Sequence, residues 1–162
     1  MNIKLTGLLA AGVLGVSLHA GAASAADYTV VNLNTSVDAP VDVVWKKIGG
    51  YCDIAAWLKL PCVLTSGTGD VGTVRRLADR IDEVMVAKTA HSYTYTQPNT
   101  TILYHGTLEV VPNGKGHSKI LYNLIWDQAA LTSDDAKTKD RDQRVKNFTA
   151  ALANMKAIVE AK

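Results

Sequence analysis

The chain has 162 residues, with 17 basic and 15 acidic side chains and a formal net charge of +2. This length holds one domain with a sizeable core rather than two domains. The near balance of charges provides no basic surface for nucleic acid or for an anionic membrane, which argues against both as partners.

The first 25 residues have the three parts of a secretory signal peptide. Lys4 is the basic start, a glycine-interrupted apolar stretch runs from Leu5 to Leu18, and Ala23-Ser24-Ala25 fits the cleavage pattern. The stretch is too short to span a bilayer as a stable helix, although an uncleaved anchor is the alternative. We therefore predict a protein exported to the periplasm or the medium. Its single mature domain covers residues 26–162 and has no transmembrane segment.

The mature chain begins with a strand and two short helices. Residues 28–37 alternate and are rich in Val and Thr, which is typical of a half-buried strand. Pro40 then begins a helix that ends at Gly49-Gly50, with Asp38 as a possible cap. A second helix is expected over residues 53–58, with Ile54 and Trp57 buried.

Cys52 and Cys62 flank this second helix. In an exported protein an even pair of cysteines usually forms a disulfide, and closing this loop would stabilise the fold by about 2.5–3 kcal/mol. The alternatives are two separate buried thiols, or a redox or metal pair. The spacing is not that of a C-x-x-C motif, so we favour the structural disulfide.

The middle of the chain is predicted to form a series of β-hairpins. Asn113-Gly114 is the strongest turn signal, and all the connections are too short for parallel crossovers. The expected antiparallel strands cover residues 62–66, 72–77, 81–88, 91–96, 101–111 and 117–126.

A long amphipathic helix is predicted from Ser133 to Lys162. Its apolar stripe recurs at spacings of 3, 4, 3 and 4 and consists of Val145, Phe148, Leu152, Met155 and Val159. The stretch from Lys137 to Arg144 is polar, so this half of the helix is not expected to form dry packing. The contrast points to a ligand cavity under the helix.

This order of elements resembles the helix-grip fold of the START-like superfamily, also called the SRPBCC family. The segments that carry the resemblance are Val37-Asp38-Ala39-Pro40 with Val44-Trp45, Ile54-Ala55-Ala56-Trp57-Leu58, Gly69 to Arg75, and Ser92-Tyr93-Thr94-Tyr95. The resemblance implies an α+β fold of order β-α-α-β6-α, with a bent seven-stranded antiparallel sheet wrapped around the C-terminal helix and an apolar cavity between them. The signal peptide and the cysteine pair depart from the common pattern, so a cytosolic role is not carried over.

The resemblance also implies a function in binding a small hydrophobic molecule, such as a lipid, an isoprenoid-like compound or a polyketide-like aromatic. Period-2 alternation places four tyrosines and one tryptophan on the strand faces that we assign to the cavity, unless they simply pack the core. The predicted cavity residues are Tyr93, Tyr95, Tyr104, Leu108, Tyr122, Leu124, Trp126, Arg141, Val145, Phe148 and Leu152.

Three polar residues are weaker candidates for a role in the cavity. Arg141 extends the apolar stripe by one turn and could bind a carboxylate at the cavity mouth, although pairing with Asp142 or Asp127, or plain exposure, is the alternative. Glu83 and His105 are the other candidates for acid/base work, and alternation turns His105 outward.

The sequence gives little support for a dinucleotide, metal or other cofactor site. Gly67-x-Gly69-x-x-Gly72 matches a dinucleotide fingerprint, but a strand follows it where that motif needs a helix. The histidines are scattered without a carboxylate at ligand spacing, so we expect neither a metal nor another cofactor. A non-enzymatic carrier is the leading hypothesis. The alternatives are a cyclase or dehydratase in the same cavity, and a partner-binding protein whose cavity has closed, although no protein partner is indicated.

Overall fold

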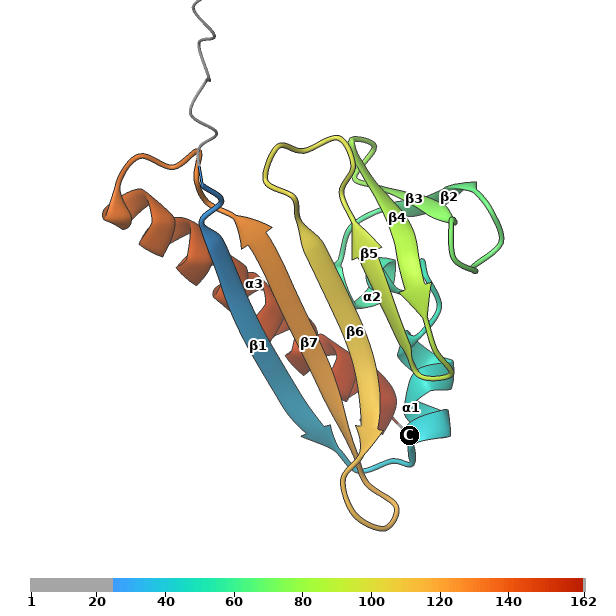
Figure 1. Cartoon of the computed structure of the whole chain (residues 1–162). Helices are drawn as coiled ribbons and strands as arrows, with labels where there is room; N and C mark the ends of the chain where they lie inside the picture. Colours follow the sequence, from blue (N-terminus) through green and yellow to red (C-terminus); the bar gives the residue numbers. More distant parts are fainter. Residues whose placement is uncertain (1–24, 162) are drawn as a thin grey trace, which may run out of the picture.

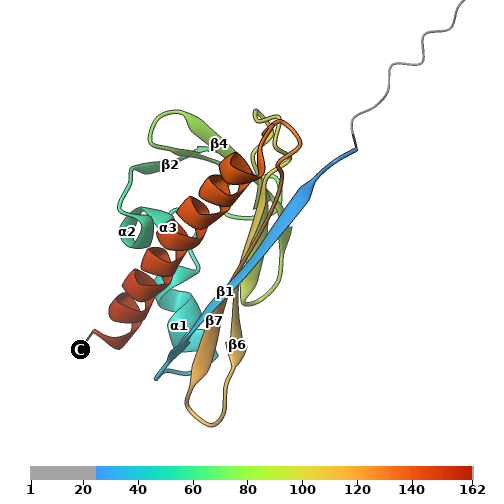
Figure 2. The same ribbon diagram turned by 90° about the vertical axis from the view of Figure 1, so that its left-hand side faces the viewer.

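The computed structural model describes residues 25–161 and shows a seven-stranded antiparallel sheet with three helices on one face (Figures 1 and 2). The predicted signal peptide, apart from Ala25, lies outside the described residues. The elements are β1 (Tyr28–Val37), α1 (Val41–Ile48), α2 (Ile54–Leu58), β2 (Cys62–Ser66), β3 (Val74–Leu77), β4 (Ile81–Lys88), β5 (Ser92–Thr96), β6 (His105–Pro112), β7 (Ser118–Asp127) and α3 (Asp134–Glu160). The predicted α+β class and element order are confirmed.

The sheet order is β1-β7-β6-β5-β4-β3-β2. Strands β2 to β7 follow one another as hairpins, because their connections are only a few residues long. β1 instead pairs with the last strand, from Tyr28 opposite Asp127 to Val37 opposite Ser118. This pairing leaves β1 and β2 as the two edges of an open sheet.

Four strands begin later than the sequence predicted, β5 and β7 by one residue and β3 and β6 by more. β3 begins at Val74 rather than Gly72, and β6 begins at His105 rather than Thr101. Before β6 the chain makes a loop in which Leu103 has a φ of +47°, a left-handed conformation that is incompatible with a regular strand. The Asp127 backbone N–H donates to the Ile102 carbonyl at 2.6 Å, which holds this loop against the end of β7.

The cap and stop residues predicted for the helices are found in the structure, with one exception. Gly49 ends α1, and the Ser133 hydroxyl caps α3 by accepting from the Ala136 N–H at 3.2 Å. Asp38 does not cap α1, whose N-cap residue is Pro40, and its carboxylate lies 3.0 Å from His117 Nδ1. Cys52 and Cys62 form the predicted disulfide, which joins the segment before α2 to the start of β2.

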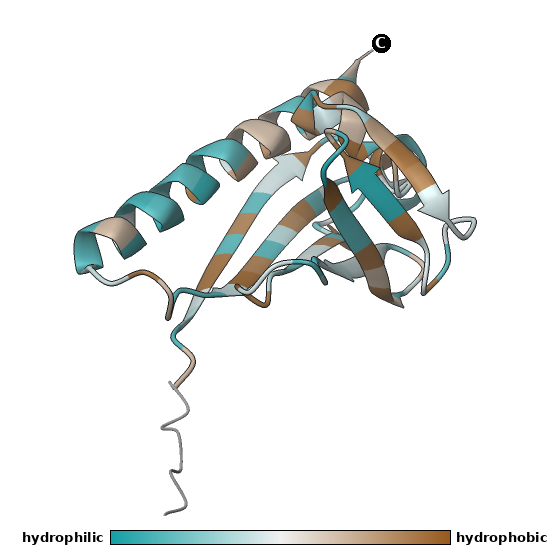
Figure 3. Ribbon diagram, turned by 90° about the horizontal axis from the view of Figure 1, so that it is seen from above, coloured by the Kyte–Doolittle hydropathy of each residue, from teal (hydrophilic) through white to brown (hydrophobic). Residues whose placement is uncertain are grey.

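The core lies between the sheet and the helices. Figure 3 shows that the N-terminal half of α3 is mostly hydrophilic, whereas apolar residues gather toward its C-terminal half. Leu152, Met155 and Val159 of that half are buried against the sheet. Val44 and Ile48 of α1, and Ile54 and Trp57 of α2, complete the helical side of the core.

Candidate functional site

The inward faces of β5, β6 and β7 form a buried aromatic wall. As alternation predicted, Tyr93, Tyr95, Tyr104, Leu108, Tyr122, Leu124 and Trp126 are all at most 2% exposed. The Tyr95 and Tyr122 hydroxyls are hydrogen-bonded at 2.8 Å, and those of Tyr95 and Tyr104 lie 3.4 Å apart. These hydroxyls therefore satisfy one another inside the core.

Burial is the main reason that the pKa of each of these tyrosines is raised, because it penalises the phenolate. The ring of Tyr95 lies directly over Gly106 of the neighbouring strand. A Cβ at Gly106 would fall 2.4 Å from the Tyr95 ring and hydroxyl, so the close approach requires glycine there. The tyrosines are thus neutral hydroxyls held in a fixed arrangement.

A buried ion pair adjoins this wall and was not predicted as a pair from the sequence. Arg75 of β3 is fully buried, and its Nε donates to Glu83 Oε2 at 2.8 Å. Arg75 Nη1 donates to the Tyr51 carbonyl at 2.6 Å, while Gln97 Nε2 donates to Glu83 Oε1 at 2.9 Å. The sequence did contain a signal for this pair, because Arg75 and Glu83 lie opposite each other in the β3–β4 hairpin. Both also fall at positions whose alternation turns them toward the core.

Aromatic rings enclose the Arg75 guanidinium. Its Cζ lies 4.3 Å from the Tyr51 ring centroid and 4.6 Å from that of Tyr95. Burial acts to lower the pKa of Arg75, but Tyr93 and the Glu83 carboxylate raise it by more, so the group is charged. Nη2 lies 2.6 Å from Glu83 Oε2 without a well-aligned hydrogen bond, so one donor group of this cation is left incompletely satisfied.

The polar half of α3 also packs on the sheet, through Asp140 and Arg144. Asp140 Oδ2 accepts from Trp126 Nε1 at 2.7 Å and from Gln128 Nε2 at 3.1 Å. Arg144 Nε donates to the same carboxylate at 3.2 Å. The Arg144 guanidinium stacks 4.8 Å over the Trp126 ring, so this helical half is held by polar contacts that an apolar stripe does not reveal.

Arg141 is placed differently from its neighbour Arg144. Its side chain is 53% exposed and lies 3.5 Å from Asp142, which is one of the alternatives considered from the sequence. Arg144, one turn further along the helix, is the cation that covers Tyr104 and Trp126. The sequence predicted a cation in this part of α3 but named Arg141 rather than Arg144.

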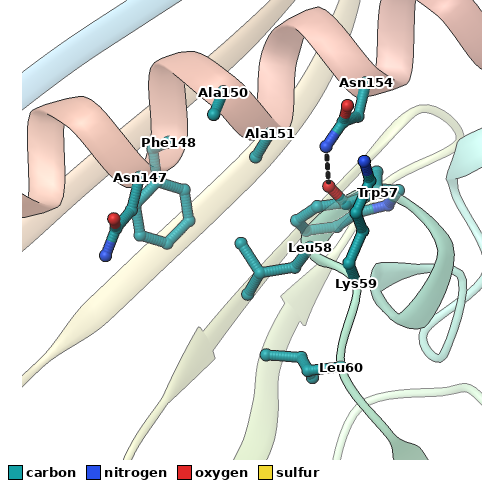
Figure 4. A pocket seen from close by; sticks show the side chains of 9 residues that line it. All are labelled: Trp57, Leu58, Lys59, Leu60, Asn147, Phe148, Ala150, Ala151 and Asn154. Carbon is teal, nitrogen blue, oxygen red and sulfur yellow. Dashed lines mark hydrogen bonds between the residues drawn. The ribbon is translucent and has the colours of Figure 1, made fainter.

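A pocket of about 570 Å³ lies between α2 and the middle of α3 (Figure 4). Of the predicted cavity residues, only Phe148 lines it. Val145 is half-buried and Leu152 is buried elsewhere along α3. The lining residues are Trp57, Leu58, Lys59, Leu60, Asn147, Phe148, Ala150, Ala151 and Asn154.

The floor of this pocket is continuous with the aromatic wall. The Phe148 ring lies 4.6 Å from the Tyr122 ring, and the Trp57 ring lies 5.9 Å from it at a steep angle. Trp57 and Phe148 therefore separate the pocket from the Tyr95–Tyr122 hydroxyl pair. A ligand in the pocket would rest on rings that form part of the core.

The polar side chains at the pocket are those of Lys59, Asn147, Asn154 and the Trp57 indole. Asn154 Nδ2 donates to the Trp57 carbonyl at 2.9 Å and so joins the two walls (Figure 4). Lys59 ends α2 in a left-handed conformation, with φ 57° and ψ 48°. The indole Nε1 of Trp57 is buried and has no hydrogen-bond partner among the described residues.

A second pocket, of about 510 Å³, lies between the end of α1 and β4. Tyr51, Met85 and Tyr93 line it together with the exposed chain around Gly49-Gly50 and Lys88. Two of its rings also border Arg75, so the buried ion pair lies behind this second pocket.

The remaining candidates for chemistry, Glu83 and His105, line neither pocket. Glu83 is buried with both carboxylate oxygens engaged, and His105 Nδ1 lies 2.9 Å from the Leu103 carbonyl. Within residues 25–161 no group of three or more His, Cys, Asp or Glu side chains is placed to hold a metal ion. In the same range no helix is both long enough and apolar enough to cross a membrane.

Comparisons with known proteins agree with this architecture. The sequence profile of the family described as "Polyketide cyclase / dehydrase and lipid transport" matches residues 29–160. No match was found among curated proteins.

Solved structures with the same fold share little sequence with the chain. A protein from Nitrosospira multiformis is 21% identical with a TM-score of 0.68, and the match covers 82% of this chain and 97% of that one. The Zhui aromatase/cyclase from Streptomyces sp. R1128 is 17% identical with a TM-score of 0.68, over 83% and 94% of the two chains. Truncated norcoclaurine synthase from Thalictrum flavum is 18% identical with a TM-score of 0.61, over 85% and 97%. At these identities the likeness shows the fold alone.

Proposed function

The chain belongs to the polyketide cyclase/dehydrase and lipid transport family, and from this premise we propose that it binds a small, mostly apolar molecule between the sheet and α3. The ligand enters at the pocket between α2 and α3. It is held by desolvation against the aromatic floor that Trp57 and Phe148 form, and no reaction is required of the protein.

The single observation that carries this proposal is the double role of Trp57 and Phe148. Both residues line the pocket, and both contact Tyr122 of the buried wall. A pocket of about 570 Å³ is within the usual size range of small-molecule sites. Apolar ligand surface removed from water on these rings contributes roughly 25 cal/mol per Å².

The protein is further proposed to act after export. The signal-peptide pattern of residues 1–25 and the Cys52–Cys62 disulfide support this location, because disulfides persist in oxidising compartments. A carrier outside the cytoplasm would shield an apolar compound from water during its transfer.

A pocket-filling variant tests the proposal. Ala150 is exposed on α3 and lines the pocket, so Ala150→Trp places an indole in the ligand volume without disturbing the core. Ala153→Trp is the matched control, because Ala153 is exposed on the same helix and does not line the pocket. The neutral apolar dye N-phenyl-1-naphthylamine should bind the wild type and Ala153→Trp alike, and Ala150→Trp at least about tenfold more weakly.

Native mass spectrometry of the protein from its own compartment, followed by denaturing extraction, identifies the natural cargo. A stoichiometric apolar molecule would support the carrier. Equal dye binding by the two tryptophan variants would place the ligand elsewhere. A protein that arrives empty and binds none of a lipid and aromatic library would instead support a partner-binding role.

An enzyme of the cyclase or dehydratase type is the second candidate, and the Tyr95–Tyr122 hydroxyl pair is the observation that favours it. With pKa values raised by burial, these tyrosines are able to donate hydrogen bonds or protons but not to serve as bases at neutral pH. Tyr95→Phe separates the two functions. It should leave binding of an apolar ligand nearly intact, and it should abolish turnover only if the hydroxyl transfers a proton.

A further inference from the structure

The charge of the α2–α3 pocket comes from one residue. Lys59 is the only charged residue among the nine that line it, and none of them is acidic. Within residues 25–161 the Lys59 ammonium forms neither an ion pair nor a hydrogen bond, and unlike the other unpaired lysines of the helices, Lys46, Lys139 and Lys146, it lines this pocket. An uncompensated cation at a pocket rim favours an anionic group of the ligand.

The neutral polar groups of the pocket also favour an anionic group on the ligand. Asn147 Oδ1 already accepts from Gln143 at 2.8 Å, which leaves its amide N–H₂ as the free group. Asn154 Nδ2 donates to the Trp57 carbonyl, which leaves Asn154 Oδ1 as an acceptor, and the buried Trp57 Nε1 is a donor without a partner among the described residues. Together with the Lys59 ammonium, the Asn147 amide N–H₂ gives the lining more free donors than the one side-chain acceptor left without a partner, Asn154 Oδ1, and donors match the oxygens of an anion.

The rest of the lining is apolar. Leu58 and Leu60 lie on either side of Lys59 in the chain, and Phe148 and Ala151 face them from α3 (Figure 4). Any molecule that reaches Lys59 with its polar end therefore has its body against hydrocarbon. The ligand that satisfies both parts of the pocket is an amphiphile.

We propose that the α2–α3 pocket selects amphiphiles with an anionic end, such as a carboxylate, and that Lys59 sets this preference. The inference rests on the proposed function, because it names the class of molecule that the same pocket takes. The backbone at Lys59 agrees with it. A left-handed residue at a helix end is usually Gly or Asn, and here a long cationic side chain occupies that position at the pocket instead.

The test compares three probes with the same twelve-carbon chain, each used below its micelle concentration in calorimetric titrations of the mature protein. Dodecanoate is expected to bind about two- to fivefold more tightly than 1-dodecanol, with dodecylammonium weakest, as for one exposed ion pair. Lys59→Met should bring dodecanoate to the affinity of dodecanol, and Lys59→Glu should favour dodecylammonium. Lys146→Met is the control, because Lys146 is exposed on α3 and does not line the pocket.

Each result has a definite meaning. Equal binding of the three probes by the wild type, or the same loss in Lys146→Met as in Lys59→Met, would overturn the inference but not the carrier, whose own test uses a neutral dye. Binding of the protein to vesicles of phosphatidylcholine with phosphatidylglycerol, without binding of monomeric dodecanoate, would also overturn it and assign Lys59 to a membrane surface. Lys59 is exposed, so its variants should keep the wild-type unfolding temperature, and circular dichroism checks this.

Discussion

At the scale of single residues, Arg75 and Arg76 show how alternation along one strand separates two roles. Both face a carboxylate on β4, Glu83 and Asp82 respectively, in adjacent pairs of the same ladder. The Arg75 side chain has no exposure and that of Arg76 is 44% exposed. The first pair is therefore part of the core beside the tyrosines, and the second is a solvated surface pair.

Replacing the buried arginine should be far more costly than replacing the exposed one. Arg75→Met leaves Glu83 buried without its cation, which we expect to lower the free energy of unfolding by about 3–5 kcal/mol. Arg76→Met should change it by less than about 1 kcal/mol. Urea unfolding of the two variants measures the difference. The double variant Arg75→Met/Glu83→Gln should recover part of the loss, and two equal small losses would contradict a structural role for the buried pair.

At the scale of elements, α3 is held to the sheet by two kinds of contact. Its C-terminal half buries Leu152, Met155 and Val159, whereas its N-terminal half relies on Asp140 and Arg144 at the end of β7. Apolar packing does not depend on pH, but a carboxylate that accepts several hydrogen bonds does. The two halves of one helix should therefore respond differently to acid.

The acid response follows from the Asp140 carboxylate. Burial acts to raise its pKa, but hydrogen bonds from Gln128 and Arg144 lower it by more, so the net pKa lies below the ordinary value. A depressed folded-state pKa stabilises the protein above the unfolded-state value of about 3.9, and this contribution is lost as the pH falls through the folded-state pKa. Asp140→Asn should therefore be less stable than wild type at pH 7, and the gap should narrow below about pH 4.

Urea midpoints at neutral and acidic pH measure this gap. Asp142→Asn is the control, because Asp142 is 65% exposed and its contact with Arg141 is on the surface. A constant gap between wild type and Asp140→Asn across the acid range would show that the carboxylate is not linked to folding in this way.

The segment that contains α2 is fixed by the disulfide. Replacing both cysteines by alanine should lower the free energy of unfolding by about 2.5–3 kcal/mol, because the unfolded chain then gains the freedom of an open loop. Thermal unfolding of the oxidised wild type, the reduced wild type and the double variant measures this effect. The reduced protein should resemble the variant, and a reduced protein as stable as the oxidised one would contradict the expectation.

At the scale of the whole molecule, local sequence signals were enough to predict the order of the helices and strands. The Asn113-Gly114 turn, the Gly49-Gly50 stop and the period-2 strands each act over a few residues, and all three appear where they were predicted. β6 was predicted to begin too early because its residues alternate suitably, and the left-handed Leu103 is set by contacts with β7 instead. Tertiary contacts decide such boundaries.

The candidate site was only partly accessible from the sequence, for a physical reason. The buried tyrosines follow from alternation within single strands. The pocket joins Trp57–Leu60 to Asn147–Asn154, segments about ninety residues apart, and no local pattern pairs them. Arg75 was missed as a core residue because an arginine in a strand is usually solvent-facing, and only its register with Glu83 shows otherwise.

The disulfide has one more consequence, for motion. The α2 wall of the pocket, from Trp57 to Leu60, lies wholly inside the covalent ring closed by Cys52 and Cys62. The opposite wall is the middle of α3, and the Asn154–Trp57 hydrogen bond is the polar contact that joins the two walls across the pocket. The α2 wall is therefore covalently restrained, whereas the α3 wall is held by non-covalent contacts alone, so we expect a bulky ligand to be accommodated by a shift of α3 rather than by opening of the α2 segment.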